Sequence, residues 1–345
     1  MPKSAFATRF LEGPHLQRRL VHILGQRSVQ FTILGWGAAN ALVLLVARDI
    51  LPFDWPDRSV SGRLIGANAA LLGVTVLMAV VYALTRSRKL PDLAARAPAR
   101  ADARRETLLL LAYGVLGLLG GYTLGRAFGW HPFGFHLAGT LYETHDHVEP
   151  AEALVWAGYN LVVYAVVPLI YFRRRYSAEA LNLRSNNRPG DAVVIIVVLV
   201  IESLAQGLAL GTQIFDLSFR QLLLGMPLSF GLYFVGTVLP AMIFIYAILV
   251  PRYLKLTESM ATTVILGGLT YTLMHLWDAW TVFTTPDGAA LSVVFLLFTY
   301  FGPGMMKTVL TLRTGNAWVH VWAYHALAPH TFHDAPLIVR VFQIT

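Results

Sequence analysis

Four ionisable side chains occur in apolar stretches of the sequence, where hydrocarbon would not solvate them. They are His275 and Asp278, three residues apart in YTLMHLWDAW, together with Glu202 and His325. Two imidazoles and a carboxylate are ligands that zinc accepts, and a three-ligand site leaves a fourth position for an activated water. A metal-free explanation also stands, because a buried histidine more often pairs with a carbonyl or one acid, and Asp278 lies one turn from His275.

The composition indicates that these residues belong to a membrane protein. Of the 345 residues, 56% are hydrophobic and 13% are charged, whereas roughly 25% of the residues in a soluble domain are charged. The chain has no cysteine, which excludes disulfides, thiolate zinc sites and thiol nucleophiles. The first 27 residues show no signal peptide. Their alternating basic and apolar residues suit an amphipathic helix on the membrane surface.

Charge-poor windows of the length that crosses a bilayer recur along the chain. They predict an all-α, polytopic transmembrane bundle of about nine spans. The window 222–250 is too long for one upright helix, so two interpretations stay open: one span, or an interfacial piece followed by one tilted or kinked span. The nine windows are 28–47, 64–85, 107–125, 153–172, 192–215, 222–250, 259–281, 288–306 and 315–333.

The basic residues predict the orientation of the bundle. With the N-terminus inside and the C-terminus outside, most of the 27 Lys and Arg residues fall on the inner side, Lys307 and Arg313 among them. The net charge of +8 then reflects this bias and contact with anionic lipid, so no nucleic-acid partner is expected. We predict a multi-pass protein of a bacterial cytoplasmic membrane, with the lipid bilayer and a further membrane protein as partners.

Three regions follow from these windows. Residues 1–129 form a tail and a three-span unit, residues 130–152 form an outer loop, and residues 153–345 form a six-span domain. The outer loop and the C-terminal region hold groups that could bind a metal on the outer face, although capping or partner contacts explain them as well. These groups are His145, Asp146, His147, Glu149, His330, His333 and Asp334.

Three motifs of the C-terminal region carry a family resemblance. AILVPRYL at 247–254 ends one helix, Tyr271 to His275 matches an FxxxH pattern with Tyr for Phe, and TGNAW at 314–318 leads to His325. Over about 155–335 the chain resembles the CPBP intramembrane metalloproteases, the family of the CAAX prenyl endopeptidases and bacterial abortive-infection proteins. The resemblance implies a metal held by His275 and His325, and glutamates acting as general base on the metal-bound water.

The departures from this pattern decide the expected function. Ala241 and Met242 occupy the positions of the family's two glutamates. Tyr246 replaces the arginine of the same motif, and Pro329 replaces the asparagine that ends the family's HxxxN motif. Neither alanine nor methionine accepts a proton, and a positioned acid or base contributes about 10²–10⁴-fold to a rate. We therefore expect a catalytically degenerate, CPBP-like protein that acts as a scaffold, assembly factor or accessory subunit.

Two alternatives stay open. In the first, Glu202 or Asp278 replaces the lost acid, and the chain is an active metal-dependent intramembrane endopeptidase with His275 and His325 as ligands. Zinc is then the expected cofactor. In that case Glu202 must point at the two imidazoles, and a hydrogen bond to Gln206 would make it a structural residue instead. In the second alternative His275 or His325 ligates a haem or chlorophyll, for which one imidazole in an apolar slot suffices.

Overall fold

The structure is a computed structural model of the whole chain, and it describes residues 21–47, 51–53, 59–137, 148–207 and 212–345. All regular elements in these ranges are helical, and six helices are long and apolar enough to span a membrane. The prediction of an all-α chain with multiple candidate membrane spans is confirmed. The six are Arg27–Val46, Val60–Thr85, Arg100–Ala127, Pro150–Arg173, Phe219–Thr257 and Pro286–Thr314.

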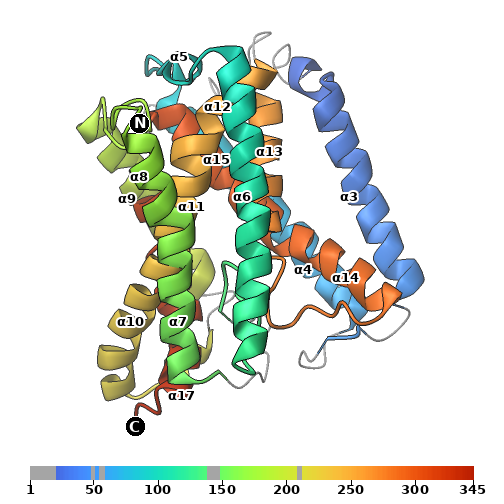
Figure 1. Cartoon of the computed structure of the whole chain (residues 1–345). Coiled ribbons are helices and arrows are strands. Elements are labelled where there is room, and N and C mark those ends of the chain that lie inside the picture. The colour runs from blue at the N-terminus through green and yellow to red at the C-terminus, as the bar shows by residue number, and fades with distance from the viewer. Residues whose placement is uncertain (1–20, 48–50, 54–58, 138–147, 208–211) are drawn as a thin grey trace, which may run out of the picture.

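Three of the nine predicted spans are shorter or more polar in the structure. α9 (Arg188–Ala205) has 18 residues and contains an arginine and two acids, and α13 (Met260–Leu273) has only 14 residues. The window 315–333 divides into α16 (Ala317–His320), η8 (Val321–His325) and η9 (Pro329–His333). The number nine therefore stays a prediction. The start of α3 and the C-terminus lie at opposite ends of the bundle (Figure 1), as the predicted topology requires.

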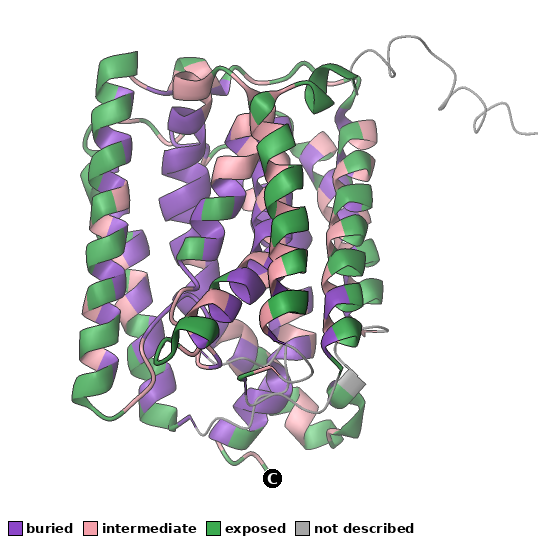
Figure 2. Ribbon diagram, turned by 90° about the vertical axis from the view of Figure 1, so that its right-hand side faces the viewer, coloured by how far each residue is buried: buried purple, intermediate pink, exposed green. Residues whose placement is uncertain are grey.

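The helices of the first predicted region lie on the outside of the bundle. α3 (Arg27–Val46) has one buried residue, Val43, and it stands apart from most of the other helices in Figure 1. α4 (Val60–Thr85) packs along α15 (Gly302–Thr314), and Arg88 pairs with Asp191 at 2.7 Å, so this region and the C-terminal helices form one bundle. Figure 2 shows the exposed residues on the outer helices and the buried ones on the central helices.

The remaining outer helices frame the centre of the molecule. α5 (Leu93–Arg96) and α6 (Arg100–Ala127) follow α4. α7 (Pro150–Asn160), η2 (Leu161–Val166) and α8 (Val167–Arg173) form the next long helix, and a short 3-10 helix, η4 (Thr212–Asp216), precedes α10. Many large apolar side chains on these helices are exposed, Leu116 and Ile170 among them, as expected for surfaces that face lipid.

The central helix answers the question left open for 222–250. Phe219–Thr257 is one continuous helical run of 39 residues, and all residues of Met242–Leu249 are buried. At about 1.5 Å per residue it is longer than a bilayer is thick. Its parts are α10 (Phe219–Tyr233), η5 (Phe234–Val238), α11 (Leu239–Ala241), η6 (Met242–Leu249) and α12 (Val250–Thr257).

Prolines explain where these helices change their winding. A proline lacks an N–H, and its ring clashes with the carbonyl four residues earlier, which a local π turn relieves by adding a residue. In each of the six π-helical segments described from end to end, the residue four before a proline lies inside the segment, whereas the π turn at 206–207 is followed by no proline before Pro227. The segments are η2 before Pro168, η5 before Pro240, η6 before Pro251, η7 (Leu297–Phe301) before Pro303, η8 before Pro329, and η9 before Pro336. α14 (Pro286–Leu296) and α17 (Ala335–Val341) complete the fold.

Candidate functional site

His275 is fully buried in the turn that follows α13. Its Nδ1 donates a hydrogen bond to the Tyr271 carbonyl oxygen at 2.7 Å, which leaves the lone pair on Nε2. Nε2 has no hydrogen-bond partner among the described residues. The ring stacks on Tyr300 with the centroids 3.7 Å apart, and Phe135 packs against it edge-on at 5.8 Å. Aromatic rings therefore enclose this imidazole.

His325 lies at the end of η8 and is also buried. Its Nε2 is 3.0 Å from the Tyr271 hydroxyl, while its Nδ1 has no hydrogen-bond partner among the described residues. The Tyr271 ring centroid lies 4.4 Å from that of His275 and 5.7 Å from that of His325. Both imidazoles thus contact one tyrosine, and we call His275, His325 and Tyr271 the central cluster.

The positions that the resemblance assigns to acids are apolar core. Ala241 is 0% exposed and Met242 is 1% exposed, and both belong to the main hydrophobic cluster of the bundle. Tyr246 is fully buried, and its ring centroid lies 4.2 Å from that of His320. Pro329 begins η9. The described structure supplies no carboxylate at any of these four positions.

Glu202 is engaged within its own helix. Its Oε1 accepts a hydrogen bond from Gln206 Nε2 at 2.8 Å, the structural alternative that the sequence left open. Lys307 attracts this carboxylate electrostatically. The orientation prediction counts Lys307 among the inner-side cations, but this residue lies within a helix and not in a loop. Lys307 is buried in α15, with Nζ 3.6 Å from the centroid of the Tyr271 ring, because the helix continues through this residue to Thr314.

Asp278 is buried beside the central cluster without pairing with the His275 side chain. Its Oδ2 accepts hydrogen bonds from the Trp280 indole N–H at 2.9 Å and from the Tyr300 hydroxyl. Since Tyr300 also stacks on His275, the tyrosine is the link between the acid and the imidazole. Asp278 therefore fixes an aromatic ring against His275.

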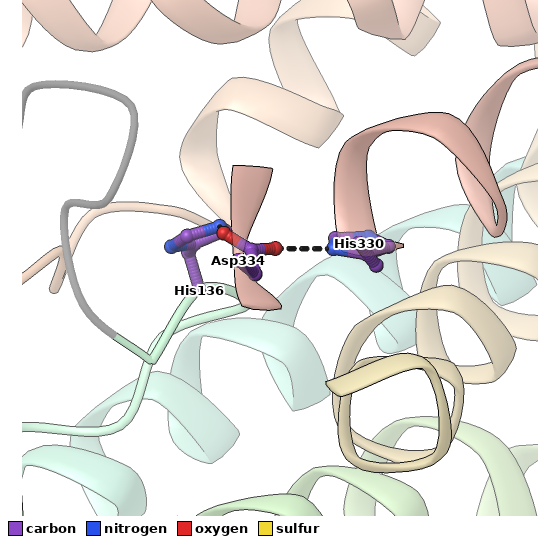
Figure 3. Close-up of side chains that lie close together, drawn as sticks. All are labelled: His136, His330 and Asp334. Atoms are coloured by element: carbon purple, nitrogen blue, oxygen red, sulfur yellow. Dashed lines mark hydrogen bonds and ion pairs between the residues drawn. The ribbon is translucent and has the colours of Figure 1, made fainter. Parts of the chain in front are cut away.

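A different set of side chains comes together near the C-terminal end of the bundle (Figure 3). His136, His330 and Asp334 each offer one ligand atom, and these atoms lie within 4.8 Å of one another. Within the described ranges this is the one such group of three. It contains none of His275, His325, Glu202 and Asp278, so the structure does not assemble the predicted His/His/Glu site. We call His136, His330 and Asp334 the end cluster.

The sequence named two members of the end cluster and missed the third. His330 and Asp334 were noted as metal-competent groups, and their i,i+4 spacing was a usable signal. His136 lies almost 200 residues earlier, so no local spacing reveals it. Of the other outer groups, Glu149 accepts a hydrogen bond from Trp130 at 3.2 Å and His333 is buried. His145, Asp146 and His147 lie outside the described residues.

Electrostatics in the end cluster favour an ionised Asp334. Burial alone would raise the pKa of this carboxyl, but the His136 and His330 imidazoles beside it lower the pKa well below its usual value. The Asp334 Oδ2 is 2.6 Å from His330 Nδ1, and its Oδ1 is 3.5 Å from His136 Nε2. The end cluster therefore presents an anionic oxygen donor and two imidazoles.

Comparison with known proteins adds no relative. The sequence matches no protein-family model, and no curated protein or solved structure matches it. Any assignment to the CPBP family therefore rests on the motifs at 247–254, 271–275 and 314–325.

Proposed function

We propose that this chain is a CPBP-like membrane protein that does not catalyse hydrolysis and that serves as a scaffold, assembly factor or accessory subunit of a membrane complex. One observation carries the proposal: Ala241 and Met242 lie in the apolar core at the positions where the resemblance calls for glutamates. A general base must lie within hydrogen-bond reach of the water that it deprotonates. The apolar side chains of Ala241 and Met242 cannot act as this general base.

The contacts of the two candidate replacement acids also support this proposal. Glu202 is bonded to Gln206, and Asp278 is bonded to Trp280 and Tyr300. Each carboxylate thus has one oxygen engaged by a neighbouring side chain other than His275 or His325. Breaking such a buried hydrogen bond costs about 1–3 kcal/mol. The Glu202 bond lies within its own helix, and the Asp278 bond to Tyr300 links two helical segments, as expected for structural side chains.

The exposed surface of the outer helices favours a protein partner within the membrane. α3 buries little of its surface against the rest of the chain, and helices associate in lipid through packing and occasional polar contacts. Its Trp36 donates to Asn68 on α4 at 2.8 Å, and Asn68 donates to Asn40 at 2.7 Å. We propose that a second membrane protein packs against this side of the bundle.

The positive-inside rule supports a cytoplasmic position for the basic end of the bundle. The helix ends near α5 in Figure 1 carry most of the described arginines, including those at the start of α6 and the end of α8. Because the chain has no cysteine, single cysteines at Arg104 and Gln343 can be labelled in intact cells with a membrane-impermeant maleimide. We expect labelling at Gln343 alone. Labelling at Arg104 alone contradicts the orientation.

The absence of hydrolysis is tested with purified protein in liposomes. A prenylated CAAX peptide and a transmembrane peptide are incubated with zinc and with the wild type, His275→Ala or Glu202→Gln. We expect the same background cleavage in all three samples. Cleavage by the wild type that Glu202→Gln abolishes would establish the active endopeptidase instead.

The subunit role is tested separately on native membranes. After mild detergent extraction, native electrophoresis is expected to show the chain in a band larger than the monomer that contains one further membrane protein. A chain that migrates as a monomer in every mild detergent contradicts the scaffold proposal.

A further inference from the structure

The end cluster joins two segments that are distant in the sequence, one holding His136 and the other holding His330 and Asp334. His136 belongs to the segment that follows α6, His330 lies in η9, and Asp334 lies between η9 and α17. Their exposed fractions are 5%, 4% and 1%. Two imidazoles and a carboxylate are seldom buried together unless their charges and hydrogen-bonding groups are matched.

From this arrangement we infer that His136, His330 and Asp334 bind a divalent transition-metal ion of the zinc type. This site is distinct from the central cluster on which the family resemblance rests. The inference goes beyond the proposed function, because a metal here would hold segments together without any hydrolysis.

The distances suit such an ion with small adjustments. In a tetrahedral site with bonds of about 2.0–2.1 Å, two ligand atoms lie about 3.4 Å apart. With Asp334 Oδ1 as the ligand atom, its distance of 3.5 Å to His136 Nε2 already matches this value. The other oxygen, Oδ2, is 2.6 Å from His330 Nδ1, a hydrogen bond that opens when a cation replaces the shared proton. One ligand atom from each of the three residues lies within 4.8 Å of the others.

A second observation marks the same place. Tyr233 is fully buried, and its hydroxyl has no hydrogen-bond partner among the described residues. Its ring is stacked on His330 at a centroid distance of 4.7 Å and lies 5.1 Å from that of His136. A buried hydroxyl without a partner points to a missing polar group nearby. Three protein ligands leave a fourth metal position, and a water there would supply that group.

The ligand types decide the class of cation. Two imidazoles with one carboxylate suit zinc and ferrous iron, whereas calcium and magnesium prefer sets of oxygen ligands. The ionised Asp334 would balance one of the two positive charges of the ion. A bound ion would tie the segment after α6 to η9 and α17, so its expected effect is on the stability of this end of the bundle.

The test uses the full chain, purified without a histidine tag, freed of metal with a chelator, and titrated with zinc. Elemental analysis is expected to find about one zinc per chain, and any single ligand substitution is expected to weaken binding by more than about 100-fold. The variants are His330→Ala, Asp334→Asn and His136→Gln, of which the last keeps an amide N–H that can donate to Asp334. Zinc should raise the melting temperature of the wild type and of none of these variants.

A matched control removes a histidine elsewhere. His22→Ala lies on an exposed helical turn, so it should bind zinc as the wild type does. If the three ligand variants fail to fold, the wild type is titrated with cobalt instead. Cobalt in a tetrahedral site of nitrogen and oxygen ligands is expected to give visible d–d absorption bands.

Two results would overturn the inference. One is a wild type that takes up no zinc, cobalt, manganese or iron and shows no melting shift with any of them, which leaves the proposed function standing. The other is zinc that survives His136→Gln and Asp334→Asn but is lost in His275→Gln and His325→Gln. That outcome places the metal in the central cluster and contradicts the proposed function as well.

Discussion

The central cluster and the end cluster contain the same residue types in opposite circumstances. In the central cluster His275 and His325 bond to the carbonyl and the hydroxyl of Tyr271. In the end cluster the two imidazoles contact a shared carboxylate, Asp334. Buried imidazoles are thus satisfied in two ways, and only the arrangement with a carboxylate collects a ligand set suited to a divalent cation.

One segment of chain connects the two clusters. Within Trp130–Leu137, Phe135 packs on His275 and the next residue, His136, contacts Asp334. The backbone of this segment is held by buried donors, since the side-chain amide of Asn160 donates to the Gly134 carbonyl at 2.8 Å. A change in this segment would therefore reach both clusters.

The largest effect is expected from returning an acid to the central core. Ala241→Glu places a carboxylate in a fully apolar environment, and an uncompensated buried charge destabilises by about 3–5 kcal/mol. Reversible unfolding in mixed micelles should show this loss in the free energy of unfolding. Met242→Leu, which nearly conserves volume, should cost less than about 1.5 kcal/mol. Equal stability of Ala241→Glu and the wild type would mean that a cationic or metal partner is present after all.

A smaller effect is expected at the carboxylate of the end cluster. In metal-free protein Asp334→Asn should lower the free energy of unfolding by about 2 kcal/mol, since hydrogen bonds to a charged group are worth about 1.5–3 kcal/mol. Because the fold lowers the pKa of Asp334 from its ordinary value of 3.8, its contribution is present above that pH and is lost as the pH falls below it. Unfolding from pH 7 to pH 3 should show the two proteins converging only below about pH 4. A constant difference down to pH 3 contradicts the role given to the carboxylate.

A substitution that disturbs the connecting segment should lower the free energy of unfolding less than Ala241→Glu does and more than the loss of a single hydroxyl in the central cluster. Asn160→Ala removes the side-chain donor to the Gly236 carbonyl and one of two donors to the Gly134 carbonyl, which keeps the Trp156 indole N–H, and an unpaired buried group costs about 1–3 kcal/mol. In zinc-loaded protein the loss should be accompanied by weaker zinc binding, because His136 sits in this segment. Asn40→Ala, on the outer helix α3, is the control and should leave zinc binding unchanged. Unaltered zinc affinity in Asn160→Ala would show that the segment holds its position by other contacts.

The sequence predicted the class of fold well and the site poorly, for physical reasons. Span length and charge depletion are local properties, so the windows around α3, α4, α6 and α7 match helices in the structure. Pro240 and Pro251 are visible in the sequence, but the sequence alone does not show whether a proline ends a helix or is accommodated by a π turn, as it is within 219–257. Convergence of side chains is not local. His136 joins Asp334 through the fold alone, and Lys307 is buried because α15 runs beyond the predicted end of its span.

The smallest effect is expected at the hydroxyl of the central cluster. Tyr271→Phe keeps the ring that contacts His275 and Lys307 and removes the hydrogen bond to His325, so it should cost about 1 kcal/mol. Combining it with His325→Gln in a double-mutant cycle isolates the hydrogen bond from the packing of the ring. Tyr122→Phe, on a half-exposed ring of α6, is the matched control and should be near neutral. A loss at Tyr271→Phe as large as that of Ala241→Glu would show that the hydroxyl holds more than one imidazole, and the central cluster would then be a connected polar network.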